Sequence, residues 1–269
     1  AKDQHPFNLA VADTVDPQFM PDLVVRLRRL APHCPVHIHP LKWQAEYLDD
    51  LAQGKLDVVI ANWEDPSEQL HRSALFNDDV VSLVSVHHPA VRRGWTLQDW
   101  LACDHIAPTP AYVGWRGVID QQLDAQGLER NIAVRCGHFS LIPAMVASSL
   151  LVLTSGRRFC ERMTQGPQSS QWVMLAPPFE FKPMTYHQLW HERSHTFAPS
   201  RWLREQVKSV AATLQREPAA AVTLSSSRDP PRVFPVTISA RLSPRRSSSG
   251  PRLAALPGPK VTFSRRVKL

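Results

Sequence analysis

Residues 7–38, FNLAVADTVDPQFMPDLVVRLRRLAPHCPVHI, decide the fold class. The apolar run Phe7–Ala12 predicts a buried strand, and Asp16-Pro17 then predicts an N-cap followed by a proline at the first helical position. Apolar residues recur at helical spacing over Phe19–Leu30, and Val36–His39 predicts a second strand. Strand, helix and strand in this order are typical of a parallel α/β unit.

The same alternation continues as far as residue 214. A helix that ends at Gly54 is followed by Leu56–Ala61, a β-branched run that suits a strand buried on both faces. Two successive α/β units, closed by a late strand and helix, predict an α/β fold with two Rossmann-like lobes. The remaining predicted elements are strands at 80–86, 105–107, 132–136, 150–154 and 184–191, and helices at 96–101, 115–126, 141–149 and 198–214.

The late strand and helix are expected to return to the first unit, so that lobe I is discontinuous. We assign residues 5–82 and 185–214 to lobe I, residues 83–184 to lobe II, and residues 215–269 to a tail. The tail is rich in Ser, Pro and Arg, has no helical period, and is expected to be disordered. Two interpretations of it stay open: a basic arm that touches nucleic acid, or a solvated or non-native extension.

The positive charge belongs to the tail. The whole chain carries 31 Lys and Arg against 24 Asp and Glu. Residues 215–269 carry 11 of the basic and 2 of the acidic residues, a local charge of +9, which leaves −2 for residues 1–214. A slightly acidic body does not predict binding to a phosphate backbone.

The cysteine pattern and the hydropathy predict a cytoplasmic chain. Four scattered cysteines without a C-x-x-C pair are typical of reduced thiols rather than of a disulfide framework. The N-terminus shows no signal-peptide pattern, and no apolar run is long enough to span a membrane. We therefore expect no membrane partner.

Several segments resemble one family. They are the opening residues 7–38, YLDDLAQGKLDVVIAN at 47–62, HPA at 88–90, HFSLIPAMVASSLLVLTSGRRF at 138–159, and LWHERSHTFAPSRWLREQV at 189–207. Together they resemble the effector-binding domain of LysR-type transcriptional regulators, in the NodD/NahR branch, over roughly residues 5–214. The tail resembles nothing in that family.

The resemblance implies a type 2 periplasmic-binding-protein fold with a ligand cleft between the lobes. It implies a small effector, aromatic or carboxylated, and a homodimer or tetramer assembled through helices 18–31 and 200–214. The alternative is that these two helices make no contact between subunits and pack only within their own lobe. DNA would be bound only through the family's helix-turn-helix, which matches no segment of this chain.

Ligands of open α/β sheets bind outside the carboxyl ends of the strands, beside helix N-termini. Asp13 and Thr14 follow the first strand there, and the resemblance implies effector contacts at this position. His138, Phe139 and Ser140 hold the equivalent place in lobe II. Each group has a plainer alternative, because Asp13 and Thr14 could only finish a turn and His138 could be a helix cap or a core histidine.

Four more candidates follow strands or begin helices. Trp63 could stack on an aromatic ligand, or it could be an ordinary contact between the lobes. Arg116, near a helix start, could pair with a carboxylate, or it could be solvated. Thr109 and Thr154 lie at strand ends on the same side.

No catalytic or metal constellation stands out. The sequence holds no G-x-S-x-G, phosphate loop or G-x-G-x-x-G. No nearby acid or cysteine completes a metal-binding set with the pairs His37/His39, His87/His88 or His191/His195, and His191 is expected in a strand that separates it from His195. We therefore expect no enzyme, no metal and no cofactor. The alternative function is a periplasmic-type solute-binding protein of a transporter, which has the same fold.

Overall fold

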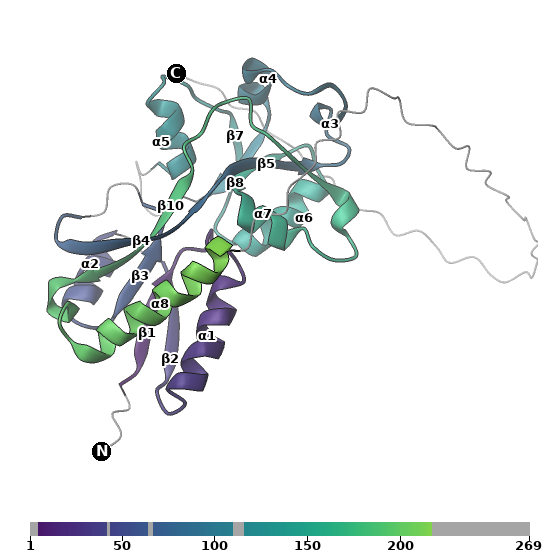
Figure 1. The fold of residues 1–269 in the computed structure, drawn as a ribbon. Helices are drawn as coiled ribbons and strands as arrows, with labels where there is room; N and C mark the ends of the chain where they lie inside the picture. Colours follow the sequence, from purple (N-terminus) through teal and green to yellow (C-terminus); the bar gives the residue numbers. More distant parts are fainter. Residues whose placement is uncertain (1–4, 42–43, 64–66, 110–115, 217–269) are drawn as a thin grey trace, which may run out of the picture. The chain divides into compact units, whose positions relative to one another are not determined.

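The computed structural model describes residues 5–41, 44–63, 67–109 and 116–216, all within one unit of the chain, Ala1–Val222. Two five-stranded sheets organise this unit, and we call their surroundings lobe I and lobe II (Figure 1). The strands of lobe I, in spatial order, are β2 (Val36–Pro40), β1 (Phe7–Val11), β3 (Val58–Ala61), β10 (Met184–His191) and β4 (Leu70–Asp78).

Lobe II repeats this pattern. Its strands, in spatial order, are β7 (Ile132–Cys136), β6 (His105–Pro108), β8 (Val152–Gly156), β5 (Val80–Ser85) and β9 (Trp172–Leu175). In each sheet four strands run in the same direction and one runs antiparallel to them: β10 in lobe I and β5 in lobe II. The predicted two-lobed α/β fold is confirmed.

The chain passes between the two sheets twice. Asp79 alone separates β4 from β5, and residues 176–183 lead from β9 back to β10. The sheet therefore changes at Asp79, whereas the sequence suggested a boundary at 82/83, inside what is now β5. Strand β4 was not predicted at all, because LHRSALFND lacks a regular apolar alternation.

The central strands of lobe I are covered on both faces, which explains their unbroken apolar runs. Helices α1 (Phe19–Leu30) and α8 (Ala198–Arg216) lie side by side on one face, and α2 (Gln44–Ala52) covers the other (Figure 1). Residues of alternating parity face the two sides, as the period of a strand requires. Those facing α1 and α8 include Leu9, Val11, Val58 and Ile60, and those facing α2 include Ala10, Ala12, Val59 and Ala61.

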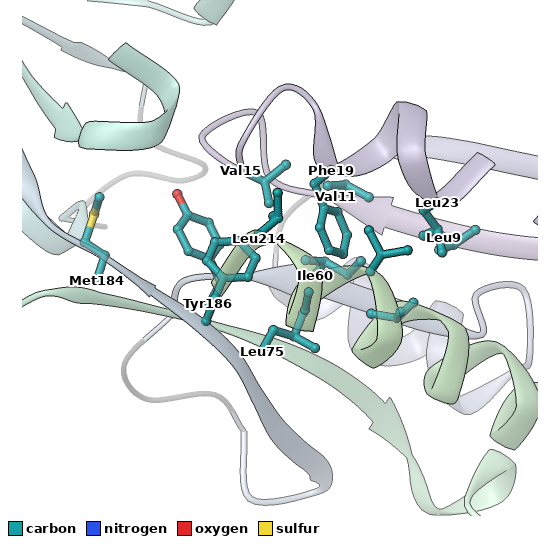
Figure 2. Packing of buried hydrophobic residues seen from close by; sticks show 14 of the residues in the cluster. Leu9, Val11, Val15, Phe19, Leu23, Ile60, Leu75, Met184, Tyr186 and Leu214 are labelled. Atoms are coloured by element: carbon teal, nitrogen blue, oxygen red, sulfur yellow. The ribbon is translucent and has the colours of Figure 1, made fainter. Parts of the chain in front are cut away.

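Figure 2 shows the packing on the α1 side. Leu9, Val11 and Ile60 of the sheet lie against Phe19 and Leu23 of α1. These five side chains are buried, and each contributes about 1.5–3 kcal/mol to the hydrophobic stabilisation of the lobe. The apolar face of α1, predicted from its spacing, is therefore what attaches this helix to the sheet.

Helix α1 begins two residues later than predicted. The carboxylate of Asp16 accepts a hydrogen bond from Gln18 N at 2.9 Å, as a capping residue would. However, Pro17 and Gln18 form a turn, and regular helix starts only at Phe19.

Short helices cover the sheet of lobe II. They are α3 (Ala90–Arg93), α4 (Leu97–Ala102), α5 (Val118–Asp124), α6 (Ile142–Ala147), α7 (Arg157–Met163), and the 3-10 turns η1 (Phe139–Leu141) and η2 (Ser169–Gln171). The helix predicted at 115–126 corresponds to α5, and Trp115 lies outside the described residues. Trp100 of α4 is fully buried and donates its Nε1–H to Ser82 Oγ at 3.1 Å.

The junction of the lobes leaves no room for a side chain at Gly156. A Cβ there would overlap Asp78 Oδ2 and lie 3.0 Å from Met184 Cε. We predict that Gly156→Ala lowers the free energy of unfolding by about 1–3 kcal/mol, measured by urea denaturation. Gly137→Ala is the matched control, since its Cβ would meet only Thr109 Oγ1 at 3.8 Å. Equal stability of both variants would contradict the close packing.

Candidate functional site

A large cavity lies between the two lobes. Its volume is about 490 Å³, which is within the usual range for small-molecule sites. Lobe I supplies the loop that follows β1 and the end of β2, and lobe II supplies the turn after β7 and part of α7. The lining residues include Ala12, Asp13, Asp16, Met20, Ile38, His39, Gly137, His138, Phe139, Ser140, Phe159 and Met163.

Asp13 and His138 face this cavity from opposite lobes. Both follow the carboxyl end of a strand, as the position rule for α/β sheets predicts. Partial desolvation raises the pKa of Asp13, and the nearby His138 lowers it. The Asp13 carboxyl group therefore interacts electrostatically with His138 across the cleft.

A smaller cavity of about 80 Å³ lies beside the first. Phe139 lines both, so the two spaces share one aromatic wall. The small cavity is also formed between the lobes. Lobe I contributes Thr14, Asn62 and Met184, and lobe II contributes Pro108, Arg116, Gly117, Val118, Ile119, Asp120, Arg130, Arg135, Thr154 and Ser155.

Three polar atoms in the residues lining the small cavity are buried without a hydrogen-bond partner in the described structure. They are Thr14 Oγ1, Arg116 Nε and Arg130 Nη1. Buried polar groups are nearly always paired, because an unmet donor costs about 1–3 kcal/mol. Three such atoms around one space indicate a site built for a hydrogen-bonding ligand.

Arg130 is held rigidly in the wall of this cavity. Its Nε donates to Asp120 Oδ1 at 2.7 Å, and the two side chains are only 2% and 9% exposed. The pairing uses one edge of the guanidinium and leaves Nη1 unpaired. The sequence did not indicate Arg130, because no local pattern shows that this charged residue is buried.

The predicted residue Arg116 lines the cavity but pairs with acidic residues outside it. Its Nη2 pairs with Asp124 Oδ1 at 2.9 Å, and its Nη1 lies 3.9 Å from Glu129 Oε1. The solvent-exposed side of its guanidinium is thus already occupied by acids, while Nε remains buried.

The structure brings most of the predicted residues together. Asp13, His138, Phe139 and Ser140 line the large cavity, and Thr14, Arg116, Phe139 and Thr154 line the small one. Two predicted residues line neither of these cavities. Trp63 stacks on Tyr47 of α2 with ring centroids 4.5 Å apart, and Thr109 is exposed near Gly137.

An ionic contact ties lobe I to lobe II beside the large cavity. The buried carboxylate of Asp16 lies 3.9 Å from Arg158 Nη1 and 3.7 Å from Arg162 Nε, both on α7. The same carboxylate also accepts a hydrogen bond from the backbone N–H of Gln18, just before α1. One carboxylate therefore connects the cavity wall, helix α1 and the opposite lobe.

Asp78 occupies the point where β4 passes into β5. Its Oδ1 accepts the N–H of Arg158 at 3.2 Å, whereas Oδ2 has no partner within the described residues. Burial raises the pKa of Asp78 to about 7, despite the opposing effect of Arg158. The junction thus holds an acid that is protonated over much of the acidic range.

This raised pKa predicts a pH dependence of stability. Above its unfolded pKa the unfolded chain loses this proton while the folded chain keeps it, so Asp78 makes stability fall from about pH 4 to pH 7 and level off above. We predict that Asp78→Asn gains about 2–4 kcal/mol over the parent across that window, measured by denaturation at several pH values. The exposed Asp79→Asn is the control, and parallel pH curves for Asp78→Asn and the parent would refute the assignment.

Another group of side chains gathers at the far end of β4. His71, Glu192 and His195 bring potential ligand atoms within 4.8 Å of one another. The sequence places His191 four residues before His195, but it predicts a strand that separates them. In the structure His191 Nδ1 accepts the N–H of Arg193, and it is His71 that joins His195.

Comparison with solved structures defines the class of fold. The regulatory domain of MexT from Pseudomonas aeruginosa superimposes with a TM-score of 0.64 at 19% identity, over 78% of this chain and 100% of that domain. HinK, a LysR family transcriptional regulator from the same species, gives 0.58 at 17% identity, over 80% and 72%. The fold is the two-lobed, type 2 periplasmic-binding-protein-like fold of such regulatory domains.

The family follows from the sequence match. The model of the LysR substrate binding domain matches residues 1–212, and the chain belongs to this family. Relatives include the HTH-type transcriptional regulator SyrM of Rhizobium meliloti (strain 1021), 27% identical over 205 residues, and the HTH-type transcriptional activator NagR of a Ralstonia species, 24% identical over 206 residues. These alignments cover 76% and 74% of this chain, and 61% and 64% of the relatives, so the chain spans about three fifths of their length. Among the described helices, none has the length and apolar character to cross a membrane.

Proposed function

We propose that this chain is the sensor domain of a LysR-type transcriptional regulator and that it binds a small aromatic carboxylate between its lobes. The observation that carries the proposal is the set of unpaired donors around the small cavity. A carboxylate offers acceptors that match Thr14 Oγ1, Arg116 Nε and Arg130 Nη1. Charge-assisted hydrogen bonds of this kind are the stronger ones in proteins.

The two cavities suit the two halves of such a ligand. A space of about 80 Å³ has room for an acid group, and the adjoining 490 Å³ has room for the body of a small molecule. Phe139 lines both spaces, so it would lie beside the bond between the acid group and the ring. The apolar side chains Met20, Ile38 and Phe159 would cover the ring.

Binding would act on the angle between the lobes. Thr14 belongs to lobe I and Arg130 to lobe II, so a ligand held by both favours conformations in which they are close. Such a ligand shifts a population only to the extent that it binds one conformation better than the other. Thr14 lies in the loop between β1 and α1, and its carbonyl accepts the Tyr186 hydroxyl at 2.5 Å. Ligand contact at Thr14 would therefore change the position of the loop that leads into α1.

The regulator would carry this change to DNA through its other parts. We propose that the whole protein is a cytoplasmic homodimer or tetramer and that a helix-turn-helix outside this chain binds DNA. The subunits would meet through the predicted helices 18–31 and 200–214. These helices also pack on each other within one chain, since Arg26 Nε donates to Gln206 Oε1 at 2.8 Å. Within these helices Ala211 is buried in its own lobe, whereas Val25 is 69% exposed.

A conservative substitution tests the ligand site. Thr14→Val removes the unpaired hydroxyl and preserves the shape of the side chain. We predict roughly tenfold weaker binding of benzoate, measured by calorimetry, because one charge-assisted hydrogen bond is lost. The unfolding temperature without ligand should be unchanged or higher, since no internal hydrogen bond is broken.

Two controls complete this test. Thr109→Val should bind benzoate as the parent does, because Thr109 lines neither cavity. Benzamide should bind much more weakly than benzoate to the parent, because it lacks the negative charge. If benzoate and a panel of other aromatic acids fail to stabilise the parent, or if Thr14→Val binds them equally well, the proposed site is wrong.

The proposed subunit interface has its own test. Val25→Glu places a charge on the exposed face of α1, and we predict at least about tenfold weaker dimerisation by light scattering, because the charge would be desolvated. Val86→Glu, at an exposed position of lobe II, should leave the dimer intact. A parent chain that stays monomeric at high concentration would rule out this interface for the fragment.

A further inference from the structure

Strand pairing brings three potential metal ligands together outside the cleft. In the antiparallel pair β4–β10, His71 lies opposite Trp190. The chain then turns through η3 (Glu192–Ser194), which returns Glu192 and His195 toward His71. Their ligand atoms lie within 4.8 Å of one another, although His71 and Glu192 are 121 positions apart in the sequence.

The contacts within this group are already close. His71 Nε2 is hydrogen-bonded to Glu192 Oε2, and the rings of His71 and His195 stack with centroids 4.2 Å apart. The hydrogen bond with His71 lowers the pKa of Glu192, so this carboxylate is anionic at neutral pH. Its side chain is 69% exposed and can turn without disturbing the core.

We propose that His71, Glu192 and His195 form a binding site for a divalent transition-metal ion of the Zn²⁺ type. Two imidazoles and one carboxylate are the ligand set that Zn²⁺ accepts, whereas Ca²⁺ and Mg²⁺ require oxygen ligands. A tetrahedral ion with bonds of about 2.0–2.2 Å keeps its ligand atoms roughly 3.4 Å apart, so the hydrogen-bonded atoms of His71 and Glu192 would separate to admit it. Water would take the fourth position.

The neighbouring groups define what binding would change. Trp190 Nε1 donates to His195 Nδ1 at 3.2 Å, so ligation through that nitrogen would replace this hydrogen bond. The guanidinium of Arg204 donates to the carbonyl oxygens of Ser194 and His195 at 3.0 and 2.7 Å and is therefore directed to the backbone. The Trp190 ring also stacks on His71, with ring centroids 5.6 Å apart, so its fluorescence should report binding at the site.

The site is independent of the proposed effector cleft. His71 lies opposite Trp190, six residues along β10 from Met184, which is roughly 20 Å along the strand. Met184 lines the small cavity. A metal ion at His71 would join β4 to the turn that leads into α8, and it would leave the cavities open.

The test uses the full 269-residue chain, freed of metal by a chelator and titrated with ZnCl₂ at pH 7.5 in a calorimeter. We expect one ion per chain, a higher unfolding temperature, and a change in tryptophan fluorescence that Trp190→Phe removes. His71→Ala and His195→Ala should each weaken binding at least about tenfold, because each deletes one of three ligands. Binding should also weaken as the buffer is made more acidic, because protons compete with the metal ion for its ligands.

The matched control is the double variant His37→Ala, His39→Ala. These histidines also lie in lobe I, with ring centroids 6.4 Å apart on β2, and their removal should leave Zn²⁺ affinity unchanged. Glu192→Gln, at an exposed position, gives a second variant if a histidine substitution impairs folding, and it should also weaken binding. Absence of Zn²⁺ binding by the parent, or loss of binding in the His37/His39 variant instead of the His71 variant, would overturn the proposal.

Discussion

The two lobes meet at Asp78, where a buried carboxyl group fills the space between two backbone crossings. Gly156 approaches so closely that a methyl group there would overlap the carboxyl oxygen, and Met184 closes the third side. The same aspartate accepts a hydrogen bond from the backbone N–H of Arg158, which lies in the first turn of α7. One of the two chain crossings passes directly beside this point, so a change of angle between the sheets would have to repack it. The cavities, the Asp16 contacts and the placement of α7 all depend on it.

Sequence patterns were sufficient to predict the strands that are buried on both faces. The runs of β1 and β3 predicted strands covered on both sides, and α1 and α2 are found there. Strand β4 was missed because it lies at the edge of its sheet and carries polar residues along LHRSALFND. The lobe boundary was misplaced for a related reason. Val80 continues an apolar run, and nothing in that run indicates that the strand belongs to the other sheet.

The candidate site was predictable in position but not in chemistry. The ends of β1 and β7 were predictable as positions that face the cleft, and Thr14 and His138 do line cavities there. Arg130 could not, because its burial depends on Asp120, ten residues earlier on another element. Trp63 follows a strand end as expected, yet a stacking partner on α2 draws it away. The histidine group was equally hidden, since only the pairing of β4 with β10 brings His71 to Glu192.

The position of β10 between β3 and β4 has a consequence for biosynthesis. As the ribosome releases the chain, β4 has no neighbour in its own sheet until residues 184–191 emerge. The strands of lobe II, residues 80–175, are contiguous and can pair before that moment. Lobe II is thus able to fold while the chain is still growing. Lobe I must pair strands that are far apart in the sequence, which is slow because closing a long loop costs conformational entropy. A chain interrupted before β10 would expose the unpaired edges of β3 and β4. Such edges are prone to aggregation and are bound by chaperones.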